Sequence, residues 1–246
     1  YLSPSEDHER IARVPPPDGA PDTDLPQQAL GFRVQNYGIR KHRDLFTPRQ
    51  LTALVTFSDL VAAARDKILA EALATGLREG DALEMGGAEG RAYADAVAAV
   101  VGLAIGRTAD FGATLCVWSP APKNEVVMHV FGRQTLSMNA DFAEVNPFSA
   151  SSGNWTGAVE WVGRAIEDLP ASGHGVAQQS DAATESFGGS ACVVSTDPPY
   201  YDNVPYADLS DFFYVWLRRA LQPVLPSLFR TVLVPKAPEL IAEPFR

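Results

Sequence analysis

Four consecutive residues, Asp197-Pro198-Pro199-Tyr200, combine groups that can hold a planar amine for reaction. The exocyclic amine of adenine or cytosine is a poor nucleophile because its lone pair is delocalised into the ring, so its geometry must be controlled. The Asp197 carboxylate and the Pro198 carbonyl can accept the two amine hydrogens and aim the lone pair at a methyl sulfonium. Tyr200 can stack on a base that has been swung out of its helix. The structural alternative is a Pro-Pro turn with a capping Asp and a core Tyr.

The motif follows an apolar, β-branched run at residues 191–196, which is typical of a strand buried on both faces of a parallel sheet. Two prolines then end the strand, because neither can donate to a sheet ladder. Open α/β sheets bind ligands at the carboxyl ends of their strands. The next residues, Tyr201, Asp202 and Asn203, are therefore candidates for lining a target-base pocket, although a loop that packs the strand end explains them equally well.

A second acid, Asp181, follows another short predicted strand at residues 175–179. If the two strands are adjacent and parallel, Asp181 and Asp197 lie at the same rim of the sheet. Taken alone, Asp181 is explained equally well as a helix-capping residue.

Helical patterns occupy much of the remaining chain. Residues 47–50, Thr-Pro-Arg-Gln, predict a helix start with a Thr cap and a capping box, and the helical spacing continues to about Leu77. Gly86-Gly87 breaks the pattern before an alanine-rich helix over 88–105, so an antiparallel helix pair is expected. Further helices are expected over 155–169 and 207–221, and extended segments over 114–118 and 125–136. The consecutive apolar and aromatic residues 212–217 are predicted to be mostly core.

The charge of the chain argues against a free-standing nucleic-acid binder, because the formal net charge is −10 and phosphate contacts supply most non-specific affinity. The best basic cluster is interleaved with aromatic residues, and it is interpreted either as a phosphate-binding patch or as a solvated loop. Its members are Arg33, Arg40, Lys41, His42, Arg43 and Arg49.

Cysteine and histidine usage indicates neither a disulfide framework nor a metal site, since Cys116 and Cys192 lie in apolar runs and the four histidines lack metal-ligand spacing. No apolar run of membrane-spanning length and no secretory signal is recognised, so a soluble, cytoplasmic protein is expected.

The longer string over residues 196–219, TDPPYYDNVPYADLSDFFYVWLRR, is far more specific than the tetrapeptide. It closely resembles the large bacterial and archaeal adenine-specific DNA methylases of the type that carries a DUF1156 domain. Residues 45–51, 143–148 and 235–240 also resemble that family. The resemblance spans the chain from about residue 30 to its end.

This resemblance implies a Rossmann-like α/β domain, S-adenosyl-L-methionine as methyl donor and DNA adenine as acceptor. Asp197, Pro198, Pro199 and Tyr200 would form the catalytic loop, and Asp181 would receive the adenine amine of the cofactor. The expected division is a Pro-rich linker and strand-like segment over 1–46, a helical insertion over 47–122 and a partial catalytic domain over 123–246. Lys236 and Glu239 would meet phosphate or cofactor, or form a surface ion pair.

One departure from the family is the lack of a glycine-rich Phe-x-Gly-x-Gly loop for the methionine part of the cofactor. The only glycine cluster, residues 85–90, follows a helix and is interpreted as a turn. We therefore expect an internal piece of the enzyme, with DNA contacts partly in other regions. Related enzymes for guanine or glutamine commonly have Asn in place of the first Asp, and those for cytosine have Ser, so Asp197 favours adenine. Cytosine, RNA or protein glutamine as acceptor, and a scaffold or DNA-contacting module without activity, stay open as alternatives.

Overall fold

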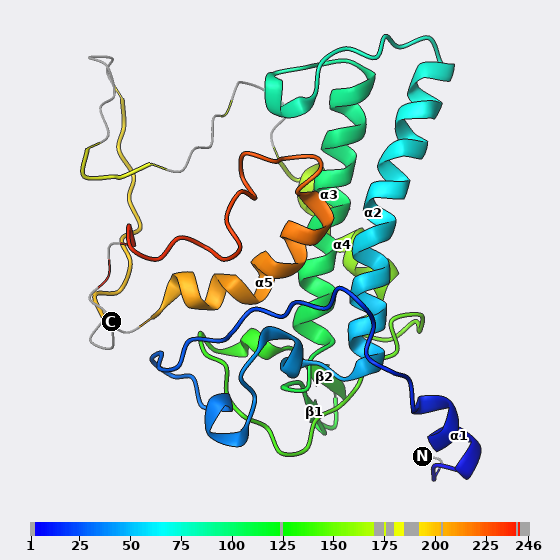
Figure 1. Cartoon of the computed structure of the whole chain (residues 1–246), viewed down its shortest axis with the longest axis vertical. Helices are drawn as coiled ribbons and strands as arrows, with labels where there is room; N and C mark the ends of the chain where they lie inside the picture. The colour runs from blue at the N-terminus through cyan, green and yellow to red at the C-terminus, as the bar shows by residue number, and fades with distance from the viewer. Residues whose placement is uncertain are drawn as a thin grey trace.

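Over its described residues the chain folds into a mainly helical structure with one small antiparallel sheet, a mixed α/β arrangement (Figure 1). The computed structural model describes residues 3–123, 125–169, 175, 180–184, 192–202, 204–239 and 241. Within them the α-helices are α1 (Glu6–Ala12), α2 (Pro48–Ala74), α3 (Gly90–Phe111), α4 (Trp155–Glu167) and α5 (Tyr206–Leu221). The 3-10 helices are η1 (Val34–Tyr37), η2 (His42–Leu45), η3 (Leu83–Met85) and η4 (Val130–Gly132), and the strands are β1 (Val117–Ser119) and β2 (Val126–Met128).

Helix α2 begins where the sequence predicts. Thr47 Oγ1 accepts the Gln50 N–H at 3.2 Å, and Gln50 Oε1 accepts the Thr47 N–H at 2.7 Å, which completes the capping box. Pro48 occupies the first turn, where its missing N–H removes no helical bond. The helix ends at Ala74, before Gly76 turns the chain with a φ of 94°.

Helices α2 and α3 form the expected antiparallel pair, and α5 lies across both (Figure 1). Small residues of α3 permit the close approach, since a Cβ on Gly102 would lie 2.8 Å from Leu221 of α5. Helix α3 is the one helix in the described ranges that is long and apolar enough to cross a membrane by length and composition. No apolar run of this length was expected from the sequence, so that expectation is wrong for α3. About half of the helix is buried in the fold, and a buried core helix meets the same criteria.

The hydrophobic core draws on all three ranges into which the sequence was divided, 1–46, 47–122 and 123–246. Trp216 and Phe212 of α5 are fully buried, and Phe46 meets Trp216 edge-on with 5.4 Å between ring centroids. The prediction that residues 212–217 are mostly core is confirmed, because these residues are buried or partly buried against the same cluster. The division into domains itself stays a prediction.

The sheet consists of two strands in the described part of the chain. Strand β1 pairs antiparallel with β2, with Trp118 opposite Val127. Both strands lie at or beside the expected extended segments, although each is only three residues long.

The larger parallel sheet is not present among the described residues, and the predicted motif strand is wrong for this structure. Residues 192–196 are exposed and pair with no strand of the described chain, while Ala191 lies outside the described residues. A strand needs neighbours for its backbone groups, and β1 and β2 pair with each other. Of the other predicted strand, residues 176–179 lie outside the described residues.

Candidate functional site at the start of α5

The Asp197-Pro198-Pro199-Tyr200 loop lies on the surface just before α5. Tyr200 is 61% exposed, so it is not the core tyrosine of the structural alternative. The Tyr200 N–H donates to the hydroxyl of Tyr206, the first residue of α5, over 3.4 Å. The loop therefore presents a carboxylate, two prolines and an aromatic ring to solvent, and its end touches the first residue of the helix.

The residues after the motif are also on the surface up to the point where the chain enters the core. Tyr201 is 78% exposed and Asp202 is exposed, while Asn203 lies outside the described residues. Val204 is then buried in the core cluster, and Pro205 is the N-cap of α5. Tyr201 and Asp202 are thus available to a ligand rather than packed beneath the loop.

Asp181 lies in a local turn of its own. Its Oδ1 accepts the Ala183 N–H at 2.9 Å, and its carbonyl accepts the Thr184 N–H at 3.0 Å. This is an Asx-type turn, close to the capping role that the sequence left open. The parallel strands that would place Asp181 and Asp197 at one rim are not formed in the described chain.

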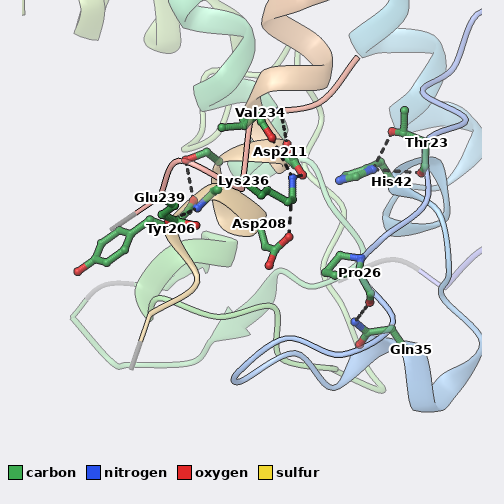
Figure 2. Close-up of polar contacts among 12 residues, drawn as sticks. Thr23, Pro26, Gln35, His42, Tyr206, Asp208, Asp211, Val234, Lys236 and Glu239 are labelled. Carbon is green, nitrogen blue, oxygen red and sulfur yellow. Dashed lines mark hydrogen bonds and ion pairs between the residues drawn. The ribbon is translucent and has the colours of Figure 1, made fainter. Parts of the chain in front are cut away.

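The first turn of α5 is capped from a distant part of the chain. Its N-cap residue, Pro205, makes no side-chain cap hydrogen bond. Glu239 Oε1 instead accepts the Ala207 N–H at 2.8 Å, from 32 residues further along. A carboxylate here is favoured by the exposed N–H groups and by the dipole of the helix. Figure 2 shows Glu239 beside Tyr206 at this end of α5.

Lys236 lies between two acids of α5, Asp208 and Asp211 (Figure 2). Its Nζ donates to Asp211 Oδ2 and to the Val234 carbonyl, the latter at 3.2 Å, and lies 3.8 Å from Asp208 Oδ1. The other Asp211 oxygen accepts the Val234 N–H at 2.8 Å. Because both acids are almost fully buried, the expectation of a surface ion pair for Lys236 is wrong.

His42, which the sequence placed in a basic cluster, is buried beside this ion group. Its Nδ1 lies 2.8 Å from Thr23 Oγ1 and 3.1 Å from the Thr23 carbonyl oxygen (Figure 2). Burial lowers the pKa of His42 below its ordinary value of 6.5, and this effect outweighs the hydrogen bond to Thr23 and the negative charge of Asp211, which raise it. His42 is therefore a neutral core residue rather than a phosphate ligand.

Several other basic side chains of that cluster are held by carboxylates. Lys41 and Arg43 lie 2.9 and 2.7 Å from Asp22, and the hydrogen bond from Lys41 lowers the pKa of Asp22. Arg49 lies 2.6 Å from Glu144, whose hydrogen bond raises the pKa of the Arg49 guanidinium. These pairs reduce the positive potential that a phosphate would meet.

Among the cavities of the described residues, two lie beside the ion group and beside Arg49. One, of about 510 Å³, lies beside the ion group and is lined by Asp24, Leu25, Pro26, Gln27, Gln28, Asp208, Asp211, Leu233 and Lys236. The other, of about 560 Å³, lies between the first turns of α2 and residues 144–148. Both volumes fall within the usual range for small-molecule sites.

The glycine cluster at residues 85–90 is a turn, as the sequence predicts. Gly86 has a φ of 78°, and a Cβ on Gly87 would lie 2.0 Å from the Asp81 carbonyl oxygen. Within the described ranges no group of three or more His, Cys, Asp or Glu could hold a metal ion.

Comparisons with models of protein families, with curated proteins and with solved structures found no match.

Proposed function

We propose that this chain is part of an S-adenosyl-L-methionine-dependent methyltransferase that modifies the N6 amine of adenine in DNA. The observation that carries the proposal is the exposed Asp197-Pro198-Pro199-Tyr200 loop, whose end contacts the first residue of α5. Its residue types are those that a planar amine requires, and its exposure leaves each of them accessible to a flipped base. The resemblance of residues 196–219 to adenine-specific DNA methylases supports the same assignment.

In this proposal the Asp197 carboxylate and the Pro198 carbonyl accept the two hydrogens of the adenine amine. Their geometry directs the nitrogen lone pair away from the ring, and Tyr200 stacks on the base. Tyr201 and Asp202 line the same pocket. S-adenosylmethionine would supply the methyl group directly, without a covalent enzyme intermediate: the S–CH3 bond would break as the N–CH3 bond forms, the thioether S-adenosylhomocysteine would leave, and the amine would release one proton to solvent.

The fit of the chain to this cofactor is partial. Asp181 is exposed and can receive the adenine amine of S-adenosylmethionine. No described segment supplies a glycine-rich loop after a strand, because the cluster at 85–90 is a turn that follows a helix. In this proposal the described residues hold only part of the methyltransferase, without the glycine-rich loop and without the parallel sheet.

The apolar residues before the motif support this incomplete-sheet interpretation. Val193 is 96% exposed and Val194 is also largely exposed, although both are β-branched residues of the kind found in buried strands. Burying one such side chain contributes about 1.5–3 kcal/mol. Burial of these two side chains by a further part of the protein would therefore be favourable.

We assign DNA binding partly to other regions of the protein because this chain offers little free positive charge. The net charge is −10, and several of the basic residues near α2 are already paired with carboxylates. Phosphate contacts need free positive charge.

The test is methyl transfer to unmethylated DNA by the protein at its native length, followed by mass spectrometry of the nucleosides. We expect N6-methyladenine from the wild type and none from Asp197→Ala. Asp141→Ala, which removes another exposed loop carboxylate, is the matched control and should keep activity. Methylation of cytosine, RNA or protein glutamine would favour those alternatives. Equal activity of Asp197→Ala and wild type would refute the catalytic assignment.

A thermal-shift titration separates the enzyme from a scaffold. A ligand that binds only the folded state raises the melting temperature. We expect S-adenosylmethionine to stabilise the native-length protein but not this chain alone, whose cofactor site is incomplete. If neither is stabilised, the scaffold alternative is favoured.

A further inference from the structure

The start of α5 is held by residues 234–239, here called the strap. The strap passes the first two turns of α5 and contacts them at both of its ends (Figure 2). At one end the Val234 N–H donates to Asp211, and at the other Glu239 accepts the Ala207 N–H. A turn between these ends is closed by the Glu239 N–H, which donates to the Lys236 carbonyl at 3.0 Å.

Lys236 fixes the middle of the strap to the protein interior. Its ammonium group bonds to Asp211, whose side chain is 1% exposed, and lies near the buried Asp208. Charged hydrogen bonds in such surroundings are stronger than exposed ones. The position of Glu239, three residues later, is therefore set by a buried anchor rather than by solvent-exposed contacts.

The helix end that the strap holds is also the end that touches the candidate catalytic loop. Ala207, whose N–H the strap caps, directly follows Tyr206, whose hydroxyl accepts the Tyr200 N–H. A continuous series of contacts thus runs from Lys236 through Glu239 and the first turn of α5 to Tyr200.

We infer that Glu239 is a positioning residue for the Asp197-Pro198-Pro199-Tyr200 loop, acting through the first turn of α5; this inference rests on the proposed methyltransferase function. An amine must be held close to its reactive geometry, and a displacement of about 1 Å can lower a rate on the order of 100-fold. Removing the cap frees the first turn of α5 and with it the Tyr206 hydroxyl that contacts the loop. Substrate binding at other positions is unaffected, so removing the cap should lower kcat and leave KM unchanged.

The chain contains a matched control in Glu84. Its Oε1 accepts the Ser227 N–H at 2.7 Å and also the Ser227 hydroxyl, so this partly exposed glutamate likewise makes a long-range bond to a backbone amide. Ser227 lies beyond the other end of α5, away from the loop. Glu84→Ala therefore removes the same kind of bond as Glu239→Ala without touching the loop.

In the native-length protein we expect Glu239→Ala to lower kcat between about tenfold and 100-fold with KM for S-adenosylmethionine unchanged. Glu239→Gln, which keeps an oxygen acceptor, should restore most of kcat, and Glu84→Ala should leave it near the wild-type value. Equal effects of Glu239→Ala and Glu84→Ala on kcat, or no rescue by Gln, would overturn the positioning role.

Amide hydrogen exchange on this chain provides a readout that needs no activity. Glu239→Ala should increase exchange at the amides of Ala207 and Tyr200, whose hydrogen bonds link the strap to the loop, relative to wild type, whereas Glu84→Ala should not. If the wild-type protein transfers no methyl group, the proposed function fails, and exchange alone decides whether the strap orders the loop. Unchanged exchange in Glu239→Ala would overturn the inference even if the protein is an active methyltransferase.

Discussion

Replacing Lys236 with methionine removes the cation from a buried group of charges while keeping most of the side-chain volume. The acids that remain, Asp211 and Asp208, are 1% and 3% exposed, and the Lys236 side chain is 23% exposed. Breaking a buried ion pair by removing one partner typically costs about 3–5 kcal/mol. Because Lys236 is partly solvated and Asp211 keeps the Val234 N–H, we expect the low end, about 3 kcal/mol.

A loss of this size should lower the melting temperature by about 6–12 °C in a chain of this length. The assay is thermal and urea unfolding of the purified chain, followed by circular dichroism. Lys67→Met provides the control, because Lys67 pairs with Glu71 over 3.8 Å with both side chains largely exposed. Such surface pairs contribute at most about 0.5 kcal/mol.

A double-mutant cycle identifies the source of the loss. Asp211→Asn combined with Lys236→Met removes both charges, so the double variant should lose less stability than the two single losses added together. The reasoning is refuted if Lys236→Met is no more destabilising than Lys67→Met, or if the two changes are additive.

Three further predictions concern other sites. Burial raises the pKa of the Cys116 thiol to about 11. A thiol reagent at neutral pH should therefore label only the exposed Cys192 in the folded chain, and rapid labelling of both cysteines would contradict this prediction. Gly87→Ala should destabilise the chain by about 1–3 kcal/mol because its Cβ would meet a backbone oxygen. Gly163→Ala, in the open interior of α4, should instead stabilise it by about 0.5–1 kcal/mol, as urea unfolding would show. Because folding lowers the pKa of His42, the unfolded state binds a proton at His42 more readily than the folded state, so wild-type stability should fall as pH drops below about 6.5. The fall should be less steep in His42→Asn. Parallel pH profiles of wild type and His42→Asn would show that His42 does not cause the pH dependence.

The helices were predictable because their signals are local. The capping box of Thr47 and Gln50 lies within one helical turn, and its residue types alone indicate the start of α2. Helix α5 was recognised from its apolar and aromatic residues, which are buried or partly buried in the core as expected. The two extended segments were placed correctly, but their lengths depend on pairing, which a single sequence does not reveal.

The contacts around the strap were not predictable in this way. Glu239 caps α5 through the amide of Ala207, 32 residues earlier, and such a distant cap leaves no local pattern. One signal was available: Asp208 and Asp211 lie three residues apart among apolar residues, so they share one helix face, and that face is buried in the structure. Buried acids need a cation, and Lys236 follows in the sequence. The exposed residues 192–196 were missed for another reason, since a strand pattern forms a strand only when neighbouring strands are present.

The most direct test of the central claim is the identity of the methylated product. DNA lacking N6-methyladenine is incubated with S-adenosylmethionine and the protein at its native length, and its nucleosides are separated by mass spectrometry. We expect N6-methyladenine that disappears with Asp197→Ala and persists with Asp141→Ala. DNA without N6-methyladenine after incubation with the folded wild-type protein would contradict it.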